Sequence, residues 1–292
     1  MNISLLKSLC QISALVYKPN TFFIENYNKE SFIKGCECFK NIDKQPEFIE
    51  SDINCQVYIS TFNKNSILCA FRGSQELRDW LTDANIIRVS MDLDNINDGE
   101  RPLVHWGILR QFRSVEKKIT NYIDNELKNN EKIENIIYTG HSLGGGLASI
   151  ALMSLSHKYP LLKHKCVTFG SPRVGNNHFR SLFVKKCDFS KRYVNYNDPV
   201  PSLPFSIRYN HSCPEEHIHT LNNVTIIQQS ETPIARFFWI MYHKFAHFCF
   251  GVEYNPVNDH SIQGYYEKLC QVFDEDDDEE IETEKVTLQE KK

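Results

Sequence analysis

A tight passage from a strand to a helix lies within residues 135–150, and it constrains the fold more than any other stretch. An apolar, β-prone run stops at Gly140, and a helical run of small and apolar residues begins a few positions later. Ser142 stands between the two runs, with Gly140 two residues before it and Gly144 two residues after it. Such a turn brings backbone segments close together, so both flanking positions have little room for a Cβ. The pattern predicts a serine held out at the tip of the turn.

A hydroxyl in that place is suited to nucleophilic attack. It would lie near the start of a helix, where free N–H groups and the helix dipole favour developing negative charge. The alternative is a glycine-rich turn that only packs a helix onto a sheet. The choice between a nucleophile and a packing turn depends on the rest of the chain. A nucleophile needs a base, an orienting acid and an oxyanion hole.

Length and charge exclude several classes of protein. The chain has 292 residues, of which 41% are hydrophobic, and can bury a large core. Its net charge is −4, but residues 274–284 hold nine acidic side chains and no basic one, so the remainder is mildly basic. No concentrated basic helix predicts nucleic-acid binding, and no apolar run reaches the roughly 20 residues of a membrane span. We expect one domain over residues 1–273 and a disordered acidic tail over 274–292.

The cysteines and the N-terminus predict a cytoplasmic protein. The ten cysteines are irregularly spaced, which permits disulfides without demanding them. Lys7 and Gln11 interrupt the first apolar run, and no small-residue cleavage site follows it. Reducing, intracellular surroundings are therefore expected.

Alternating helices and strands predict the fold class. Helices are expected over residues 3–17, 108–128, 143–158 and 262–273, and strands over 55–62, 66–71, 136–139, 165–169 and 191–196. The first two strands form a hairpin, and residues 204–232 are expected to be irregular. Strands that alternate with helices pair in parallel through crossovers, which predicts an α/β fold whose mostly parallel central sheet has helices on both faces.

A serine hydroxyl is a weak nucleophile at neutral pH and needs an imidazole base, which in turn needs an acid to fix its tautomer. Asp198 follows the end of a predicted strand, and His260 lies in a loop just before a helix. Asp188 and Asp259 compete with Asp198, but neither ends a strand. His141 adjoins the serine, and its side chain should point away from the hydroxyl. The order Ser142, Asp198, His260 is the one used by enzymes with this kind of serine turn.

Two further histidine groups suggest metal sites only weakly. One set comprises His211, Cys213, His217 and His219, whose spacing matches no common metal motif. His243 and His247 are four residues apart but lack the glutamate of a zinc-protease helix. We expect neither a metal nor a cofactor.

The oxyanion hole and a lid complete the predicted site. The N–H of Leu143 should be one oxyanion donor, and Ser74, after an earlier strand, should supply the other. Leu77, Trp80 and Leu81 are spaced as one face of a short helix, and a polar loop follows it. Such a helix could cover a pocket, although a surface helix with its tryptophan in the core explains the spacing equally well. The aromatic stretch 236–252 could similarly lie in the core or along an acyl pocket.

Six blocks resemble, in uninterrupted order, the motifs of the fungal-type (class 3) lipase family. They are Phe71–Ser74 with Asp79–Asp83, Val104–Gly107, Thr139–Gly145, Phe169–Gly175, Val194–Pro201 and Asp259–His260. The resemblance covers about residues 55–270. It implies an α/β-hydrolase fold, a triad of Ser142, Asp198 and His260, oxyanion donors at Ser74 and Leu143, and a lid within about 75–104.

The expected activity is hydrolysis of fatty-acyl esters of acylglycerols through an acyl-enzyme, without a cofactor. The expected partner is a lipid substrate at an interface, with peripheral association at lipid surfaces. A phospholipase A1 is the alternative within the same chemistry, and a non-catalytic lipid-binding relative is a second alternative.

Overall fold

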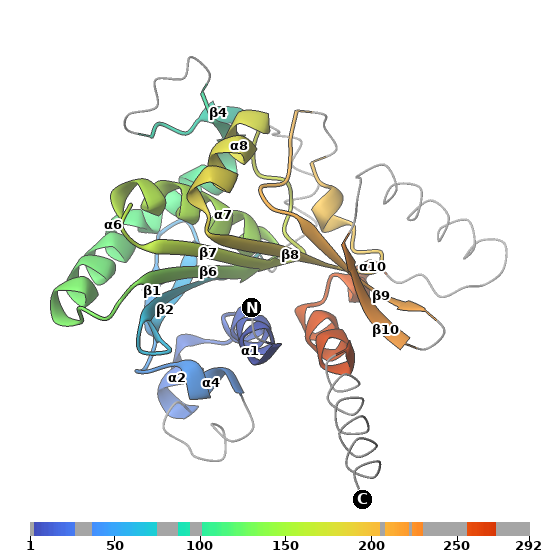
Figure 1. The fold of residues 1–292 in the computed structure, drawn as a ribbon, viewed down its shortest axis with the longest axis horizontal. Coiled ribbons are helices and arrows are strands. Elements are labelled where there is room, and N and C mark those ends of the chain that lie inside the picture. Colours follow the sequence, from blue (N-terminus) through green and yellow to red (C-terminus); the bar gives the residue numbers. More distant parts are fainter. Residues whose placement is uncertain are drawn as a thin grey trace, which may run out of the picture.

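An eight-stranded sheet forms the centre of the computed structural model, which describes residues 3–26, 37–74, 87–93, 101–204, 208–221, 224–229 and 256–272. Five neighbouring strands run parallel, and antiparallel strands extend both edges (Figure 1). In order across the sheet they are β1 (Glu47–Glu50), β2 (Gln56–Phe62), β3 (Ser66–Phe71), β6 (Asn135–His141), β7 (Lys163–Phe169), β8 (Phe189–Asn195), β9 (Glu215–Leu221) and β10 (Val224–Gln229). The predicted mostly parallel sheet is confirmed.

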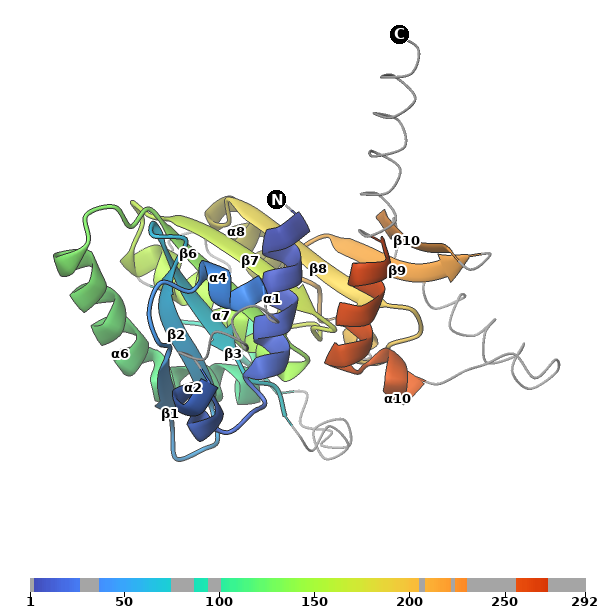
Figure 2. The same cartoon turned by 90° about the horizontal axis from the view of Figure 1, so that it is seen from below.

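Helices cover both faces of this sheet (Figures 1 and 2). One face carries α6 (Trp106–Asn129), α7 (Leu143–Lys158) and α8 (Asn177–Lys186), and the other carries α1 (Ile3–Leu15), α4 (Glu37–Asn41) and a helix over residues 262–272. The central strands are buried on both sides. In β3, for example, Ile67 and Cys69 join the hydrophobic cluster under α6 and α7, whereas Leu68 joins the cluster under α1. Alternate side chains therefore supply two separate cores.

Smaller elements lie around the sheet. They are α2 (Asn20–Asn26), the two-stranded sheet of β4 (Arg88–Ser90) and β5 (Leu103–His105), the 3₁₀ turn η1 (Val200–Ser202) and α10 (Pro256–Asp259). The predicted hairpin is confirmed as β2 and β3, with Phe62 opposite Ser66. Its loop places Asn63 and Lys64 at φ values of 52° and 63°, in the left-handed region that asparagine tolerates better than most residues.

The prediction of an irregular segment over 204–232 is wrong, because β9 and β10 lie within it. β9 is rich in charged residues and histidine and shows little of the apolar alternation that marks a strand. Its main chain nevertheless pairs in parallel with β8, at Arg192–Asn195, and in an antiparallel manner with β10. Pairing within the sheet, rather than local preference, makes this segment a strand.

Several predictions concern residues outside those described. These are the lid residues Leu77, Trp80 and Leu81, the aromatic stretch 236–252 and the acidic tail 274–292. Among the helices that the structure describes, none combines the length and the hydropathy needed to cross a lipid bilayer.

Candidate active site

The turn from β6 to α7 holds Ser142 in a strained backbone conformation. Its φ is 58° and its ψ is −130°, and a residue held in such a region costs on the order of 1–3 kcal/mol. A Cβ added to Gly140 would lie 2.5 Å from the carbonyl carbon of Gly144, and one added to Gly144 would lie 2.2 Å from the carbonyl oxygen of Phe71. Both contacts are impossibly short. Glycine is therefore required at the two positions that the sequence singled out.

Ser142 is tied to the sheet through its backbone and not through its hydroxyl. Its N–H donates to the carbonyl of Phe169, at the end of β7, over 2.9 Å. The residue is 1% exposed, and its Oγ has no hydrogen-bond partner among the described residues. Ser142 immediately precedes Leu143, the first residue of α7, so it stands at the positive end of that helix.

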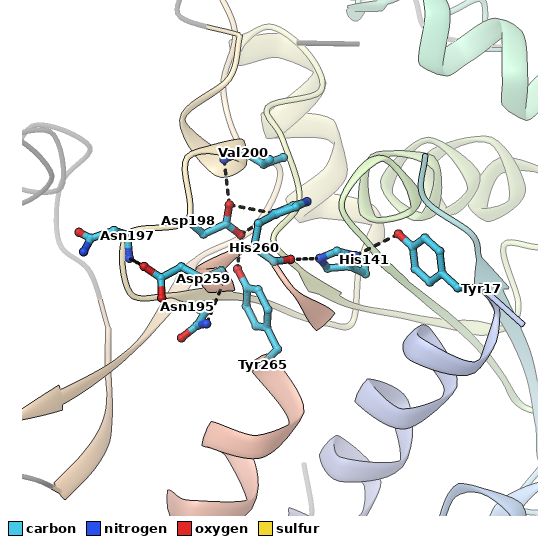
Figure 3. Close-up of polar contacts among 9 residues, drawn as sticks. All are labelled: Tyr17, His141, Asn195, Asn197, Asp198, Val200, Asp259, His260 and Tyr265. Carbon is cyan, nitrogen blue, oxygen red and sulfur yellow. Dashed lines mark hydrogen bonds and ion pairs between the residues drawn. The ribbon is translucent and has the colours of Figure 1, made fainter. Parts of the chain in front are cut away.

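Asp198 and His260 form a closely bonded, buried pair (Figure 3). Nδ1 of His260 lies 2.9 Å from each carboxylate oxygen of Asp198. The backbone N–H of Val200 donates to Oδ1 over 2.9 Å, and the hydroxyl of Tyr265 donates to Oδ2 over 2.6 Å. Three groups therefore donate to this carboxylate, one from its own turn and two from the segment that carries His260, and they hold its position and orientation.

The loop that carries His260 is anchored by its neighbour Asp259. The carboxylate of Asp259 accepts from the N–H of Asn197 over 3.2 Å, and its carbonyl accepts from the side chain of Asn195 over 2.9 Å. Asp259, which competed with Asp198 in the sequence, thus holds the loop, whereas Asp198 contacts the imidazole. Tyr265 was not identified from the sequence. It lies five residues after His260 in the following helix, and that spacing alone does not distinguish it from a core tyrosine.

The end of β7 lies between the backbone of Ser142 and the side chain of His260. Phe169 accepts the N–H of Ser142, and the next residue is Gly170. A Cβ added to Gly170 would lie 3.2 Å from Cε1 and from Nδ1 of His260. The backbone of Ser142 and the Asp198–His260 pair therefore lie on either side of one segment at the C-terminal end of β7.

His141 points toward the loop of His260, a contact that the sequence did not predict. Its Nε2 lies 2.7 Å from the backbone carbonyl of His260, and the two ring centroids are 4.6 Å apart. Burial lowers the pKa of His141 well below its usual value of 6.5, and the neighbouring His260 lowers it further. His141 is therefore neutral at physiological pH, and a carbonyl contact of this kind requires the proton on Nε2.

The expected oxyanion segment lies beside the serine. A Cβ added to Gly73 would lie 2.6 Å from the carbonyl oxygen of His141 and 3.3 Å from Cβ of Ser142. Gly73 precedes Ser74, so the end of β3 runs directly against the turn that holds Ser142. The absence of a side chain at Gly73 permits this approach.

The histidines considered as metal ligands make other contacts. Nε2 of His211 lies 2.7 Å from the carbonyl oxygen of Pro201, and Nε2 of His217 lies 2.9 Å from that of Tyr196. Within the described ranges, no three histidine, cysteine or acidic side chains are arranged to hold a metal ion. His243 and His247 lie outside those ranges.

Comparisons with known proteins relate part of the chain to lipases. A family model described as "Lipase (class 3)" matches residues 68–207. Secreted mono- and diacylglycerol lipase A of Penicillium cyclopium is 33% identical over 172 residues, which are 58% of this chain and 53% of that protein. A chloroplastic phospholipase A1 of Arabidopsis thaliana is 26% identical over 161 residues, or 50% of this chain and 35% of that protein. The chain spans about half the length, or less, of these curated relatives.

A solved structure extends the likeness to the whole fold. Rhizomucor miehei triacylglyceride lipase matches with a TM-score of 0.64 and 21% identity, over 87% of this chain and 91% of that chain. At that identity the likeness concerns the fold alone. The predicted α/β-hydrolase fold is confirmed.

The prediction of a cytoplasmic protein is wrong. The matched lipases of Penicillium cyclopium, Penicillium camembertii and Fusarium solani are named as secreted, which points to an extracellular location. The prediction relied partly on the irregular cysteine spacing. Most of the described cysteines are buried as small apolar side chains, and in that role their spacing carries little information about the redox compartment.

The match to the family model and the relatives, together with the shared fold, leads to one conclusion: residues 68–207 of this chain are similar to the class 3 lipase family.

Proposed function

We propose that this chain is a serine carboxylester hydrolase that cleaves fatty-acyl ester bonds of acylglycerols. Ser142 is the nucleophile, His260 is the general base and acid, and Asp198 orients His260. The observation that carries the proposal is the contact of both Asp198 carboxylate oxygens with Nδ1 of His260, beside a serine in a strained turn.

The chemistry follows from the tautomer of His260. Because Nδ1 faces a carboxylate, it holds the proton, and Nε2 keeps a lone pair that accepts the proton of the Ser142 hydroxyl. Oγ then bonds to the ester carbonyl carbon, and the carbonyl oxygen becomes an oxyanion. The tetrahedral intermediate collapses, and the departing alcohol takes the proton from Nε2. Water repeats the sequence on the acyl-enzyme and releases the fatty acid.

Two backbone N–H groups are proposed to bind the oxyanion, those of Leu143 and Ser74. The first is supported by the place of Leu143 at the start of α7, and the second by the close approach of Gly73 to the Ser142 turn. Each such donor contributes about 3 kcal/mol of transition-state stabilisation. The Ser142 hydroxyl has no partner among the described residues, and contacts of this kind often tighten only when substrate binds.

The substrate class is proposed from the relatives. A mono- and diacylglycerol lipase is among them, which supports neutral acylglycerols, and a phospholipase A1 is also among them. A phospholipid headgroup leaves the acyl chemistry unchanged, so phospholipase A1 activity is the second candidate. A lid built from Leu77, Trp80 and Leu81 and peripheral association with lipid surfaces both stay predictions.

The experiment compares the purified wild-type protein with Ser142→Ala on a diacylglycerol and a phospholipid in mixed micelles. We expect the wild-type protein to favour the diacylglycerol and the variant to lose activity by a factor on the order of 10⁵–10⁶. The control is Ser156→Ala, which removes a buried hydroxyl that bonds only within α7, at the far end of that helix.

The same proteins are treated with a fluorophosphonate probe. Wild type and Ser156→Ala should be labelled, and Ser142→Ala should not. Substantial turnover in Ser142→Ala would contradict the assignment of the nucleophile. An unlabelled wild-type protein would favour the non-catalytic lipid-binding alternative, and preference for the phospholipid would favour phospholipase A1.

A further inference from the structure

A chain of hydrogen bonds passes through the hydroxyl of Tyr17, just after α1, and reaches the loop of His260 (Figure 3). Oη of Tyr17 lies 3.0 Å from Nδ1 of His141. On the opposite side of that ring, Nε2 of His141 lies 2.7 Å from the backbone carbonyl of His260. An aromatic residue from the N-terminal part of the chain is thus joined, through one imidazole, to the backbone of the proposed general base.

The direction of each bond follows from elementary chemistry. A carbonyl oxygen only accepts, so Nε2 of His141 carries a proton and donates it to the carbonyl of His260. The buried imidazole is neutral, so its Nδ1 has a lone pair and accepts. The Tyr17 hydroxyl is therefore the donor to Nδ1, and burial raises its pKa so that it stays protonated at neutral pH.

The same hydroxyl also contacts the segment before Ser74. A Cβ added to Gly73 would lie only 2.2 Å from Oη of Tyr17, so the hydroxyl lies directly against the Gly73 backbone. The guanidinium carbon of Arg72 lies 5.7 Å from the centre of the Tyr17 ring and keeps the ring against the end of β3.

We propose that Tyr17 and His141 are positioning residues that hold the Gly73–Ser74 segment and the loop of His260 at fixed places around Ser142. The proposal rests on the proposed function. Neither side chain needs to touch the substrate. The contacts run from Gly73 through Tyr17 and His141 to His260, so they connect the segment of the proposed oxyanion donor to the loop of the proposed base.

A neutral His141 has a further consequence for the reaction. Its ring centroid lies 4.6 Å from that of His260, which becomes positively charged when it accepts the serine proton. A charge on His141 would oppose that step by repulsion at short range. The Tyr17 hydroxyl donates to the lone pair on Nδ1 of His141. A second proton would need that lone pair, so this hydrogen bond favours the neutral form of His141.

The chain contains a matched control for this arrangement. Oη of Tyr138, on β6, lies 3.0 Å from Nδ1 of His164, and Nε2 of His164 lies 3.0 Å from the carbonyl oxygen of Tyr159. Tyr138 and His164 are both buried, whereas in the first chain His141 is buried and Tyr17 is half-buried. This second tyrosine–histidine–carbonyl chain joins the middle of β6 to the start of β7 and the end of α7, and it includes none of the proposed catalytic segments.

The test measures kcat, KM and urea unfolding for Tyr17→Phe and Tyr138→Phe, with a soluble short-chain ester as substrate. Each variant loses one hydroxyl that donates to a neutral imidazole, and Tyr138→Phe should lose at least as much stability because its contact is more deeply buried. Tyr17→Phe should lower kcat about tenfold or more, because small displacements of catalytic groups are costly. KM should change less than about twofold, and Tyr138→Phe should keep the kcat of the wild-type protein.

A double variant adds a measurement that a purely structural role would not affect. If Tyr17 acts through His141, combining Tyr17→Phe with His141→Gln should lower kcat no further than His141→Gln alone. An unchanged kcat in Tyr17→Phe, or equal losses in Tyr17→Phe and Tyr138→Phe, would overturn the inference. A wild-type protein without esterase activity or fluorophosphonate labelling would instead overturn the proposed function.

Discussion

Gly170→Ala tests how tightly the end of β7 holds the Asp198–His260 pair. Gly170 has a φ of +59°, in the left-handed region that disfavours a side chain. Its missing side chain faces the pair directly. A Cβ would lie 2.7 Å from Oδ2 of Asp198 and 3.2 Å from Nδ1 of His260. The substitution therefore strains the backbone and pushes against both polar groups.

The magnitude of each effect can be estimated separately. An alanine in the left-handed region costs about 1–2 kcal/mol of stability, whatever the available space. To restore ordinary contact at 3.4 Å, Oδ2 of Asp198 must retreat by about 0.7 Å. That oxygen already bonds Nδ1 of His260 at 2.9 Å and the hydroxyl of Tyr265 at 2.6 Å. A shift of this size would lengthen at least one of these bonds beyond about 3.2 Å, the usual limit for a good hydrogen bond.

We expect kcat on a soluble ester to fall on the order of 100-fold, because the base loses its alignment with the serine. KM should change little, and urea unfolding should report the loss of stability. The control is Gly146→Ala in α7, where an added Cβ would meet the end of the flexible Ile108 side chain at 3.0 Å and Pro172 at an ordinary 3.6 Å. Alanine also favours the helix by up to about 1 kcal/mol over glycine, so this variant should remain stable and active.

Wild-type kcat in Gly170→Ala, together with an unfolding midpoint like that of Gly146→Ala, would refute the reasoning. It would mean that the Asp198–His260 pair tolerates displacement or that its alignment does not limit the rate. A loss of stability with wild-type kcat would refute only the predicted displacement of Asp198 and His260 by the added Cβ.

Two further predictions concern Tyr265 and the buried histidines. Tyr265→Phe removes a donor to the Asp198 carboxylate and should lower kcat roughly tenfold, equivalent to about 1.5 kcal/mol. Tyr266→Phe removes the hydroxyl that bonds Gln11 on α1 and should not change kcat in the same assay. Burial lowers the pKa of His141 and of His164 below 6.5, so the unfolded chain binds protons that the folded protein excludes. Stability should therefore be greatest above pH 6.5 and fall below it, with each histidine adding up to about 1.4 kcal/mol per pH unit to the slope. Urea unfolding at several pH values measures that slope, and an equal slope in His164→Gln would contradict the contribution of that residue.

Local sequence patterns were sufficient to predict the central part of the fold. The glycines around Ser142 indicated a strand–turn–helix unit because steric limits on a Cβ act between residues close in the chain. The buried runs of β3 and β6 indicated strands for the same kind of reason, since apolar side chains on both faces imply burial on both faces. β9 escaped prediction because its strand structure depends on pairing with β8.

The relationships among distant residues were decided only by the tertiary structure. Asp198 and Asp259 were both candidates in the sequence, and the fold brings Asp198 to the imidazole while Asp259 bonds the backbone of Asn197. Nothing near Tyr17 in the sequence indicates a contact with His141, 124 residues away. The physical reason is that a local pattern reports backbone sterics and burial, whereas hydrogen bonds between distant side chains exist only after the sheet has assembled and brought their segments together.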